Sequence, residues 1–326
     1  MKPSSLWCLA LVTPLAAGAA GCGSDDGDGQ VEGEHHRYVV ATLSTVATNK
    51  LDIDDNGRTE NKLGDLVGLL TAANFGVQAT VDEAVNTGSA VLLADLQTSS
   101  FSSAASAGFA VYLGDSASIT PAPCTDITML ATCGQHLKGT GAFTIAAGSP
   151  RDTLLTGPFA GGTMKGGPGK ISLQLALTGA PITVSLTSAR VQISDVSADG
   201  IGRGLIGGGV TQTELDTTVL PGVTAQLKAV IDRDCGPEAE RALSGGVCGR
   251  QPVGGSFTAC MAGTTGETVL APTSGFDSTR DCKVTLAEVK AHPILAQGLS
   301  PDLMVNGQPA MSAVLGFTAK KGSFTP

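Results

Sequence analysis

The chain has 326 residues, a formal net charge of −9 at pH 7, and only nine Phe, two Tyr and one Trp. The acidic balance and the scarcity of aromatic side chains exclude the basic footprint and the stacking platforms of nucleic-acid-binding proteins. The 44 glycines predict a loop-rich β protein rather than a helical bundle.

The chain begins with the pattern of a bacterial export signal, in which Lys2 precedes an apolar run over Leu6–Ala20. This run is shorter than the roughly 20 apolar residues that a membrane-spanning helix needs. It ends in Ala19-Ala20-Gly21-Cys22, which resembles the bacterial lipobox, where small residues precede a cysteine. The resemblance implies that residues 1–21 are a signal peptide and that Cys22 is lipidated. The alternative is an ordinary signal peptide with a chance cysteine.

Residues 22–36 are expected to form a flexible acidic tether, because Val31 is the one apolar residue between Gly23 and Glu34. A lipid anchor makes a membrane the expected partner of this exported protein. The lipidated cysteine is followed by Gly23 and not by the Asp associated with inner-membrane retention in some bacteria. We therefore expect the outer membrane or the cell surface.

The first part of the folded chain alternates between extended and helical patterns. Leucine and valine recur at helical spacing over Lys62–Ala73, which predicts a helix with one buried face. Strands are predicted on either side of it, over Tyr38–Thr45, Val91–Gln97 and Phe109–Leu113. After the strand over Phe109–Leu113, a loop is expected over Pro121–Cys133.

The middle of the chain carries the most regular pattern. Apolar residues alternate with small polar ones over Ile171–Leu177 and again over Ile182–Ile193, on either side of Gly179-Ala180-Pro181. This period of two predicts antiparallel strands with one buried face, and a parity shift near Val191 predicts a bulge. We expect the glycine-rich segments 161–169 and 200–209 to be turns, since neither matches a phosphate-binding loop.

The C-terminal part is predicted to contain two helices and a closing strand. Thr211–Glu214 resembles a capping box before a helix that Pro221 breaks or kinks. The stretch 235–282 is expected to be mostly loop, followed by a helix over Leu286–Ala296 and a strand over Ala313–Ala319.

These elements lack a βαβ rhythm and predict an α+β fold. We expect a mostly antiparallel β-sheet, in a sandwich or an open barrel, with a few helices and disulfide staples. Residues 37–270 would form the β-rich domain, and residues 271–326 would pack on the same domain.

Six cysteines remain beyond the lipobox, which in an exported protein predicts three disulfides. They are Cys124, Cys133, Cys235, Cys248, Cys260 and Cys282. Six cysteines allow 15 pairings, and pairing of sequence neighbours (124–133, 235–248 and 260–282) is the most economical.

The segment Asp277–Glu288 resembles a calcium loop of the EF-hand type over its full length. Ligands are expected at its positions 1, 3, 5, 7, 9 and 12, which are Asp277, Thr279, Asp281, the carbonyl of Lys283, Thr285 and Glu288. Position 6 is Cys282 where the motif has Gly, so either the turn differs or a disulfide holds it. The alternative is a polar loop in which Thr285 and Glu288 cap a helix.

A weaker second calcium site is expected at Asp52, Asp54, Asn56, Arg58 and Glu60. It has the DxDxNG start of a calcium loop, but position 12 is Leu63, so that Glu60 or Asp65 would have to replace the missing ligand. A solvated acidic turn is the alternative. This layout is similar to that of uncharacterised exported bacterial lipoproteins, a resemblance that implies no activity.

Local catalytic patterns are absent: the sequence has no HExxH and no GxSxG. Three functions therefore stay open. The first is a lipid-anchored structural or interaction protein of the cell envelope with weak Ca²⁺ loops. The second is a binding module for an apolar ligand on the alternating sheet at 171–193. The third is a hydrolase without a recognisable motif.

Overall fold

In the computed structural model, which describes residues 31–73, 75–124, 133–175 and 181–326, the first strand closes the main sheet on itself. Strand β1 (Glu34–Ser44) pairs antiparallel with β2 (Leu92–Thr98) and also with β13 (Gln308–Ser323). The expected signal peptide (residues 1–21), Cys22 and the expected tether as far as residue 30 lie outside the described residues. Glu34–His36, expected at the end of the tether, are the beginning of β1.

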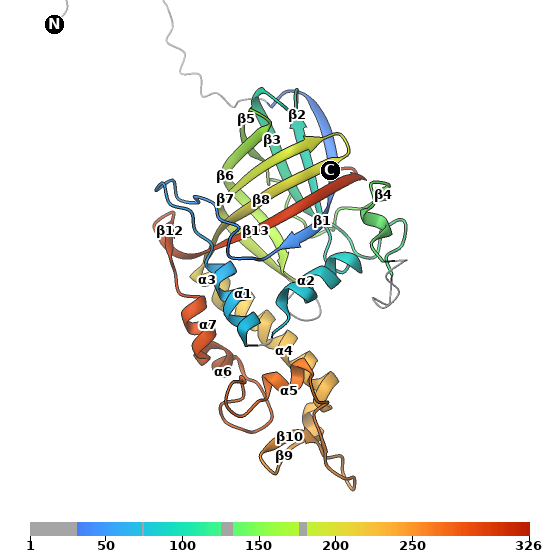
Figure 1. The fold of residues 1–326 in the computed structure, drawn as a ribbon, viewed down its shortest axis with the longest axis vertical. Coiled ribbons are helices and arrows are strands. Elements are labelled where there is room, and N and C mark those ends of the chain that lie inside the picture. The colour runs from blue at the N-terminus through green and yellow to red at the C-terminus, as the bar shows by residue number, and fades with distance from the viewer. Residues whose placement is uncertain (1–30, 74, 125–132, 176–180) are drawn as a thin grey trace, which may run out of the picture. The chain divides into compact units, whose positions relative to one another are not determined.

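Among the described residues the main sheet has ten strands, eight of which form a ring (Figure 1). Around the ring, β2 is followed by β3 (Ala104–Leu113), β5 (Leu155–Ala160), β6 (Thr163–Leu175), β7 (Ile182–Ser197), β8 (Gly200–Thr211) and β13. Two short strands lie off the ring, and both pair with β13: β4 (Gly141–Ala142) and β12 (Leu303–Val305). The mostly antiparallel sheet is confirmed. It is neither two stacked sheets nor an open one, because β1 pairs with β13.

The alternating segment in the middle of the chain forms the expected hairpin. Strands β6 and β7 pair from Thr163 opposite Ser194 to Leu175 opposite Ile182, with register shifts on either side of Gly169. Their apolar residues are buried in the core, namely Ile171, Leu173, Val184 and Leu186. Core packing therefore accounts for the alternation. The intervening residues 176–180 lie outside the described residues.

A bulge interrupts β7, slightly earlier than the sequence predicts. The pairing of β7 with β8 shifts between Thr187 and Arg190, and Ser188 adopts a left-handed backbone with φ of 48°.

The glycine-rich segment 200–209, expected as a turn, is strand β8. The reason is the close approach of β13. A Cβ on Gly204 would lie 2.3 Å from the ring of Phe317, and a Cβ on Gly207 would lie 2.5 Å from the carbonyl oxygen of Ala313. The glycines make room for the neighbouring strand, so here they indicate tight packing and not chain reversal.

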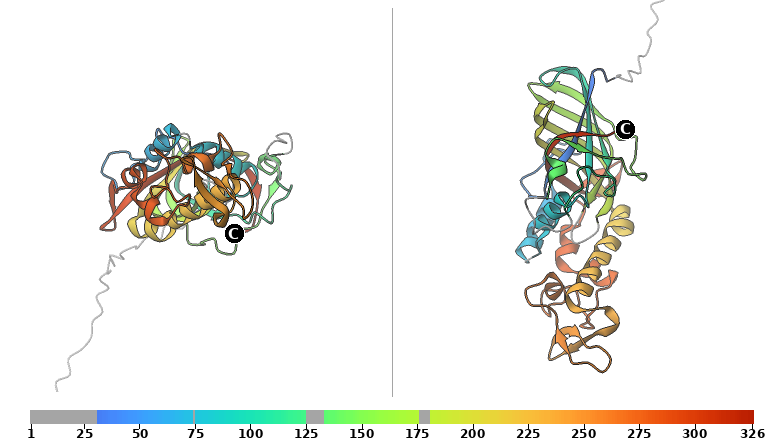
Figure 2. Two further views of the ribbon diagram at one scale, coloured as in Figure 1. Left: turned by 90° about the horizontal axis from the view of Figure 1, so that it is seen from below. Right: turned by 90° about the vertical axis from the view of Figure 1, so that its right-hand side faces the viewer.

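The helices gather at one end of the ring, below the sheet in Figures 1 and 2. The expected helix is confirmed as α1 (Lys62–Ala72), whereas α2 (Val77–Asn86) was not predicted. Thr211 caps α3 (Gln212–Glu214), and a π-helical turn over Leu215–Val219 leads into α4 (Leu220–Cys235). The last predicted helix is divided at Pro293 into α6 (Leu286–Ala291) and α7 (Pro293–Gly298). Single 3₁₀ turns cover Gln135–Leu137 and Glu238–Glu240.

The stretch 235–282, expected as loop, contains a small sheet and a helix. The sheet consists of β9 (Arg241–Ser244), β10 (Val247–Arg250) and β11 (Thr258–Ala259), and the helix is α5 (Thr265–Val269). In Figure 2 these elements lie beyond the end of α4, on the side away from the ring.

Three disulfides are present, as the sequence predicts, but two of the expected pairs are wrong. The observed bridges are 124–133, 235–260 and 248–282. Cys248 lies in β10, and Cys260 directly follows β11, the strand that pairs with β10. The amide of Cys260 donates to the carbonyl of Cys248 at 3.1 Å. From there one cysteine reaches the end of α4 and the other reaches the loop at Cys282. Pairing is thus decided by the small sheet and not by distance along the sequence.

Peptide mapping of the oxidised protein should recover the pairs 235–260 and 248–282. These bridges staple a region with little regular structure, so reduction should destabilise it, by typically about 2–4 kcal/mol for each bridge. Digestion under non-reducing conditions followed by mass spectrometry would identify the linked peptides. Recovery of 235–248 and 260–282 would show that the arrangement of the small sheet is wrong.

His136 should make the protein sensitive to mild acid. Its side chain is 1% exposed, packs edge-on against Phe143, and has no hydrogen-bond partner on either ring nitrogen among the described residues. Burial lowers the pKa of this histidine below its ordinary value of 6.5. The unfolded chain therefore binds a proton that the folded chain does not, and stability is lost as the pH falls through 6.5.

The difference in unfolding free energy between the wild type and His136→Phe isolates this effect. It should be constant above pH 7, and below pH 6.5 it should change by at most about 1.4 kcal/mol per pH unit, in favour of the variant. His292, whose pKa burial also lowers, is present in both proteins and cancels. Parallel stability profiles between pH 7 and 5 would contradict the prediction.

Candidate calcium-binding loops

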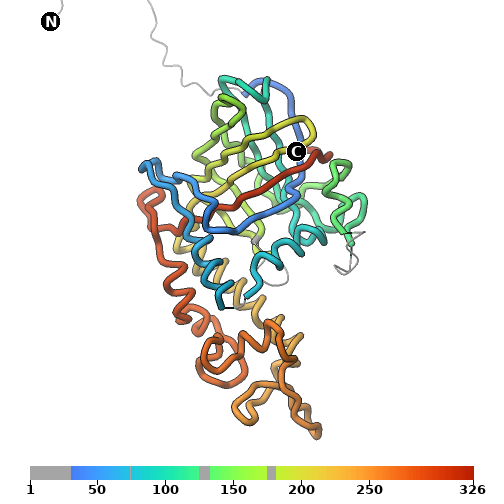
Figure 3. Tube along the Cα trace, in the orientation of Figure 1, coloured from blue at the N-terminus to red at the C-terminus, as the bar shows by residue number. Residues whose placement is uncertain are grey.

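The acidic loop at 52–60 lies between β1 and α1, and a buried side chain anchors it to the main sheet. Ile53 is fully buried in an apolar cluster with Leu51 and with residues of β12 and β13. Figure 3 shows this blue loop beside the red C-terminal segment. Arg190 of β7 donates from Nε to the carbonyl of Ile53 at 3.0 Å and forms an ion pair with Asp55. The sequence carries no signal for Arg190, because the contact crosses more than a hundred residues.

The backbone of this loop wraps around the carboxylate of Asp52. One oxygen accepts the amide of Asn56 at 3.1 Å, and the other accepts the amide of Gly57 at 3.0 Å. The side chain of Asn56 in turn accepts the amide of Arg58 at 2.7 Å. Asp55 and Gly57, at the fourth and sixth positions, have left-handed backbones.

Three carboxylates of this loop converge. One oxygen each from Asp52, Asp54 and Glu60 lies within 4.8 Å of the others. Oδ1 of Asp54 and Oε2 of Glu60 are buried and have no hydrogen-bond partner among the described residues. Burial raises the pKa of Glu60; an interaction with the backbone of Ile53 opposes this in part, and the charges of Asp54 and Asp52 raise the pKa again. Of the two residues expected to replace the missing ligand, Glu60 belongs to the triad, whereas Asp65 is exposed on α1 and does not.

The loop at 277–288 has the same backbone pattern at the same positions. The carboxylate of Asp277 accepts the amides of Asp281 at 3.1 Å and Cys282 at 2.8 Å. The side chain of Asp281 accepts the amide of Lys283 at 3.0 Å. The fourth and sixth residues, Arg280 and Cys282, have left-handed backbones with φ of 57° and 61°. Two segments far apart in the sequence therefore form the same turn.

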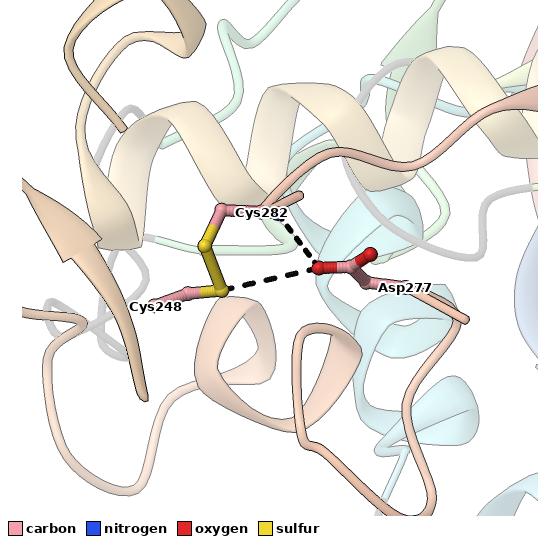
Figure 4. Close-up of side chains that lie close together, drawn as sticks. All are labelled: Cys248, Asp277 and Cys282. Carbon is pink, nitrogen blue, oxygen red and sulfur yellow. Dashed lines mark hydrogen bonds between the residues drawn. A yellow bond between two sulfur atoms is a disulfide. The ribbon is translucent and has the colours of Figure 1, made fainter. Parts of the chain in front are cut away.

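The sixth position of this second loop is held by a disulfide. Figure 4 shows Cys282 bonded to Cys248, with the carboxylate of Asp277 facing the bridge. The sulfurs are bonded to each other and are not free thiolates, so this group is not a metal site of the thiolate type. Because a disulfide sulfur carries no proton, the 3.9 Å approach of Cys248 Sγ to Asp277 is a contact and not a hydrogen bond.

Glu288, at the twelfth position, is saturated with hydrogen bonds. Its Oε1 accepts from the hydroxyl of Ser278 and from the amide and hydroxyl of Thr279, at 3.0–3.1 Å. Its Oε2 accepts from the amide and hydroxyl of Thr285, at 2.9–3.0 Å. Thr285 accepts the amide of Glu288 in return, which completes the helix cap that the sequence offers as the alternative to a calcium loop. Burial raises the pKa of Glu288, but these hydrogen bonds outweigh it and lower the pKa to about 2.

The two loops therefore differ in what their carboxylates lack. In the loop at 277–288, the first, third and twelfth residues converge, since Thr279 Oγ1 lies 3.5 Å from Asp277 and 3.0 Å from Glu288. The carboxylate oxygens of Glu288 nevertheless accept hydrogen bonds from amides and hydroxyls of the same loop. In the loop at 52–60, two buried carboxylate oxygens are left without partners. A buried, unpaired carboxylate oxygen is costly, and a cation would relieve that cost. This geometry favours the loop that the sequence ranks second.

None of the helices in the described ranges combines the length and the apolar composition that a membrane crossing requires. Comparisons with protein-family models, with curated proteins and with solved structures found no match for this chain.

Proposed function

We propose that this chain is a lipid-anchored structural or interaction protein of the cell envelope whose loops bind calcium. The observation that carries the proposal is the acid triad of Asp52, Asp54 and Glu60, two of whose buried oxygens have no hydrogen-bond partner in the part of the chain that the structure describes. Ca²⁺ prefers oxygen ligands and tolerates irregular coordination. The three disulfides are consistent with export.

The matched backbones of the two loops support calcium over a chance gathering of acids. Both loops use the first residue to hold the amides of the fifth and sixth, and both are left-handed at the fourth and sixth positions. In the loop at 52–60, this turn brings the carboxylates of the first, third and ninth residues close together. The affinity expected of such exposed extracellular loops is low, with a Kd on the order of 10⁻⁴ to 10⁻³ M.

An interaction role is supported by apolar side chains on the disulfide-bridged region. Among the large exposed hydrophobic residues, several fall within the short stretch from β9 to the segment after β11, namely Leu243, Val247, Val253 and Met261. Exposed apolar groups that gather on one region are typical of a surface that meets another protein.

Calcium should stabilise the protein through the loop at 52–60. At ten times Kd the gain is about 1.4 kcal/mol, which corresponds to a rise in melting temperature of a few degrees. Asp54→Asn should remove most of this rise, because it neutralises a buried ligand with little change of shape. Asp65→Asn makes the same change at an exposed site outside the triad and should keep the rise. Thermal melts in millimolar calcium and in chelator measure both.

Glu288→Gln separates the two loops. It should lower the melting temperature in chelator, because hydrogen bonds to a charged group contribute roughly 1.5–3 kcal/mol. The calcium response should survive, since the triad at 52–60 is untouched. Loss of the whole response in Glu288→Gln would assign the principal site to the loop at 277–288. A wild type with no response at millimolar calcium would remove calcium from the proposal.

The lipid anchor is tested by Cys22→Ala in a bacterial host. Without the cysteine, the chain should accumulate as unprocessed precursor or be released from the membrane. Two or more acyl chains anchor a protein stably, whereas one binds only marginally. Cell fractionation and intact mass would show the difference. A variant that is processed and bound to the membrane like the wild type would contradict lipidation at Cys22.

A further inference from the structure

A second feature of the described chain has no part in the calcium loops. A cavity of about 260 Å³ lies where α2, α4 and α7 meet the end of α1. Its lining comes mainly from apolar side chains of these helices, together with Phe276 from the segment before the second loop. The central members are Leu70, Phe75, Val77, Val223, Leu227 and Leu295.

The chemistry of the lining selects an uncharged ligand. No charged side chain is among the described residues that line the cavity. An ionised ligand would therefore leave water without gaining a counter-charge, which is strongly unfavourable. The polar residues of the lining are Thr80, Gln226 and Thr265, and the hydroxyl of Thr80 donates to the carbonyl of Gly76, which leaves its oxygen able to accept.

The walls are fixed before any ligand arrives. The ring of Phe276 stacks on His292 with centroids 4.1 Å apart and meets the ring of Phe75 edge-on at 5.7 Å. The amide of Phe276 donates to the carbonyl of Val269 at 2.7 Å, and the amide of Phe75 donates to that of Leu70 at 2.9 Å. Rings held in this way cannot collapse into the cavity without losing these contacts.

The cavity adjoins a smaller and wholly apolar one. A space of about 50 Å³ lies against the sheet, and both spaces are lined by Leu70, Val223 and Leu295. Its other walls include Ile182 and Val184 of β7. For comparison, an engineered apolar cavity of about 150 Å³ in another protein is large enough to bind benzene. The larger space can therefore take a molecule of one or two rings, or a short aliphatic chain.

We propose that this cavity binds a small, uncharged, apolar molecule with a hydrogen-bonding group directed at Thr80 and Thr265. Gly76 is an exposed residue of the lining and therefore lies at the mouth, where the cavity meets solvent; a Cβ there would meet only the Cβ of Ala79, at 4.0 Å, and φ is an ordinary −78°. Neither sterics nor backbone conformation requires glycine at this position. A larger side chain would fit at position 76 and would cover the opening.

The probe for this site is 1-aminonaphthalene, an uncharged molecule of two rings whose emission shifts to shorter wavelengths in apolar surroundings. The wild type should bind it saturably with one site for each chain. Gly76→Phe should weaken binding at least tenfold by covering the mouth. Gly68→Phe is the matched control, because Gly68 is exposed on α1, a Cβ there meets nothing within 4 Å, and the added ring is the same. It should bind like the wild type.

Far-ultraviolet circular dichroism and melting temperature establish that both variants fold. If Gly76→Phe does not fold, Ala79→Phe takes its place, since Ala79 is an exposed residue of α2 that also lines the opening. The proposal is overturned if the wild type shows no saturable binding, or if the folded mouth variant binds as tightly as the Gly68→Phe control. Because neither glycine belongs to a calcium loop, the result does not depend on calcium binding.

Discussion

The pairing of β1 with β13 is the constraint on which the rest of the fold depends. The strands join residues 38–44 to residues 316–321, so nearly the whole described chain lies between the two strands that close the ring. The entropic cost of closing so long a segment grows only slowly with its length. The gain is that β1 and β13 have neighbours on both sides, and that the large side chains between the strands are enclosed. A chain that loses this pairing exposes two strand edges and opens the core together.

Ring closure also decides what the loop at 52–60 can do. Asn61, 3% exposed, accepts the amides of Gly64 and Val314 and donates to the carbonyl of Val314 at 3.0 Å. One side chain thus caps α1 and joins it to β13, directly after Glu60. The loop at 52–60 therefore lies between β1 and the point where Asn61 contacts β13, the two strands that close the ring. Any cation that holds its carboxylates together also holds the entry of α1 against the last strand.

Sequence patterns predicted what depends on near neighbours. The helix α1, the hairpin of β6 and β7 and the cap at Thr285 all follow from spacings within a few residues, and the number of disulfides follows from the count of cysteines. Helix α2 carried a readable signal too, since Val77, Val81 and Val85 recur at intervals of four and are buried. Three features had no local signal: the glycines of β8, the disulfide partners, and the contact of Arg190 with the loop at 52–60. Each is decided by a strand or helix that the chain reaches much later.

The two loops show one turn stabilised in two ways. A non-glycine residue in the left-handed region costs roughly 1–2 kcal/mol, and Cys282 accepts that cost where Gly57 does not have to. The disulfide of Cys282 offsets this cost. The carboxylate oxygens of Glu288 accept hydrogen bonds from amides and hydroxyls of the loop. The loop at 52–60 has the favourable glycine but no covalent bridge, and one buried oxygen each of Asp54 and Glu60 lacks a hydrogen-bond partner among the described residues. The turn that is cross-linked is complete within the protein, whereas the turn that is not cross-linked is the one that a cation would complete.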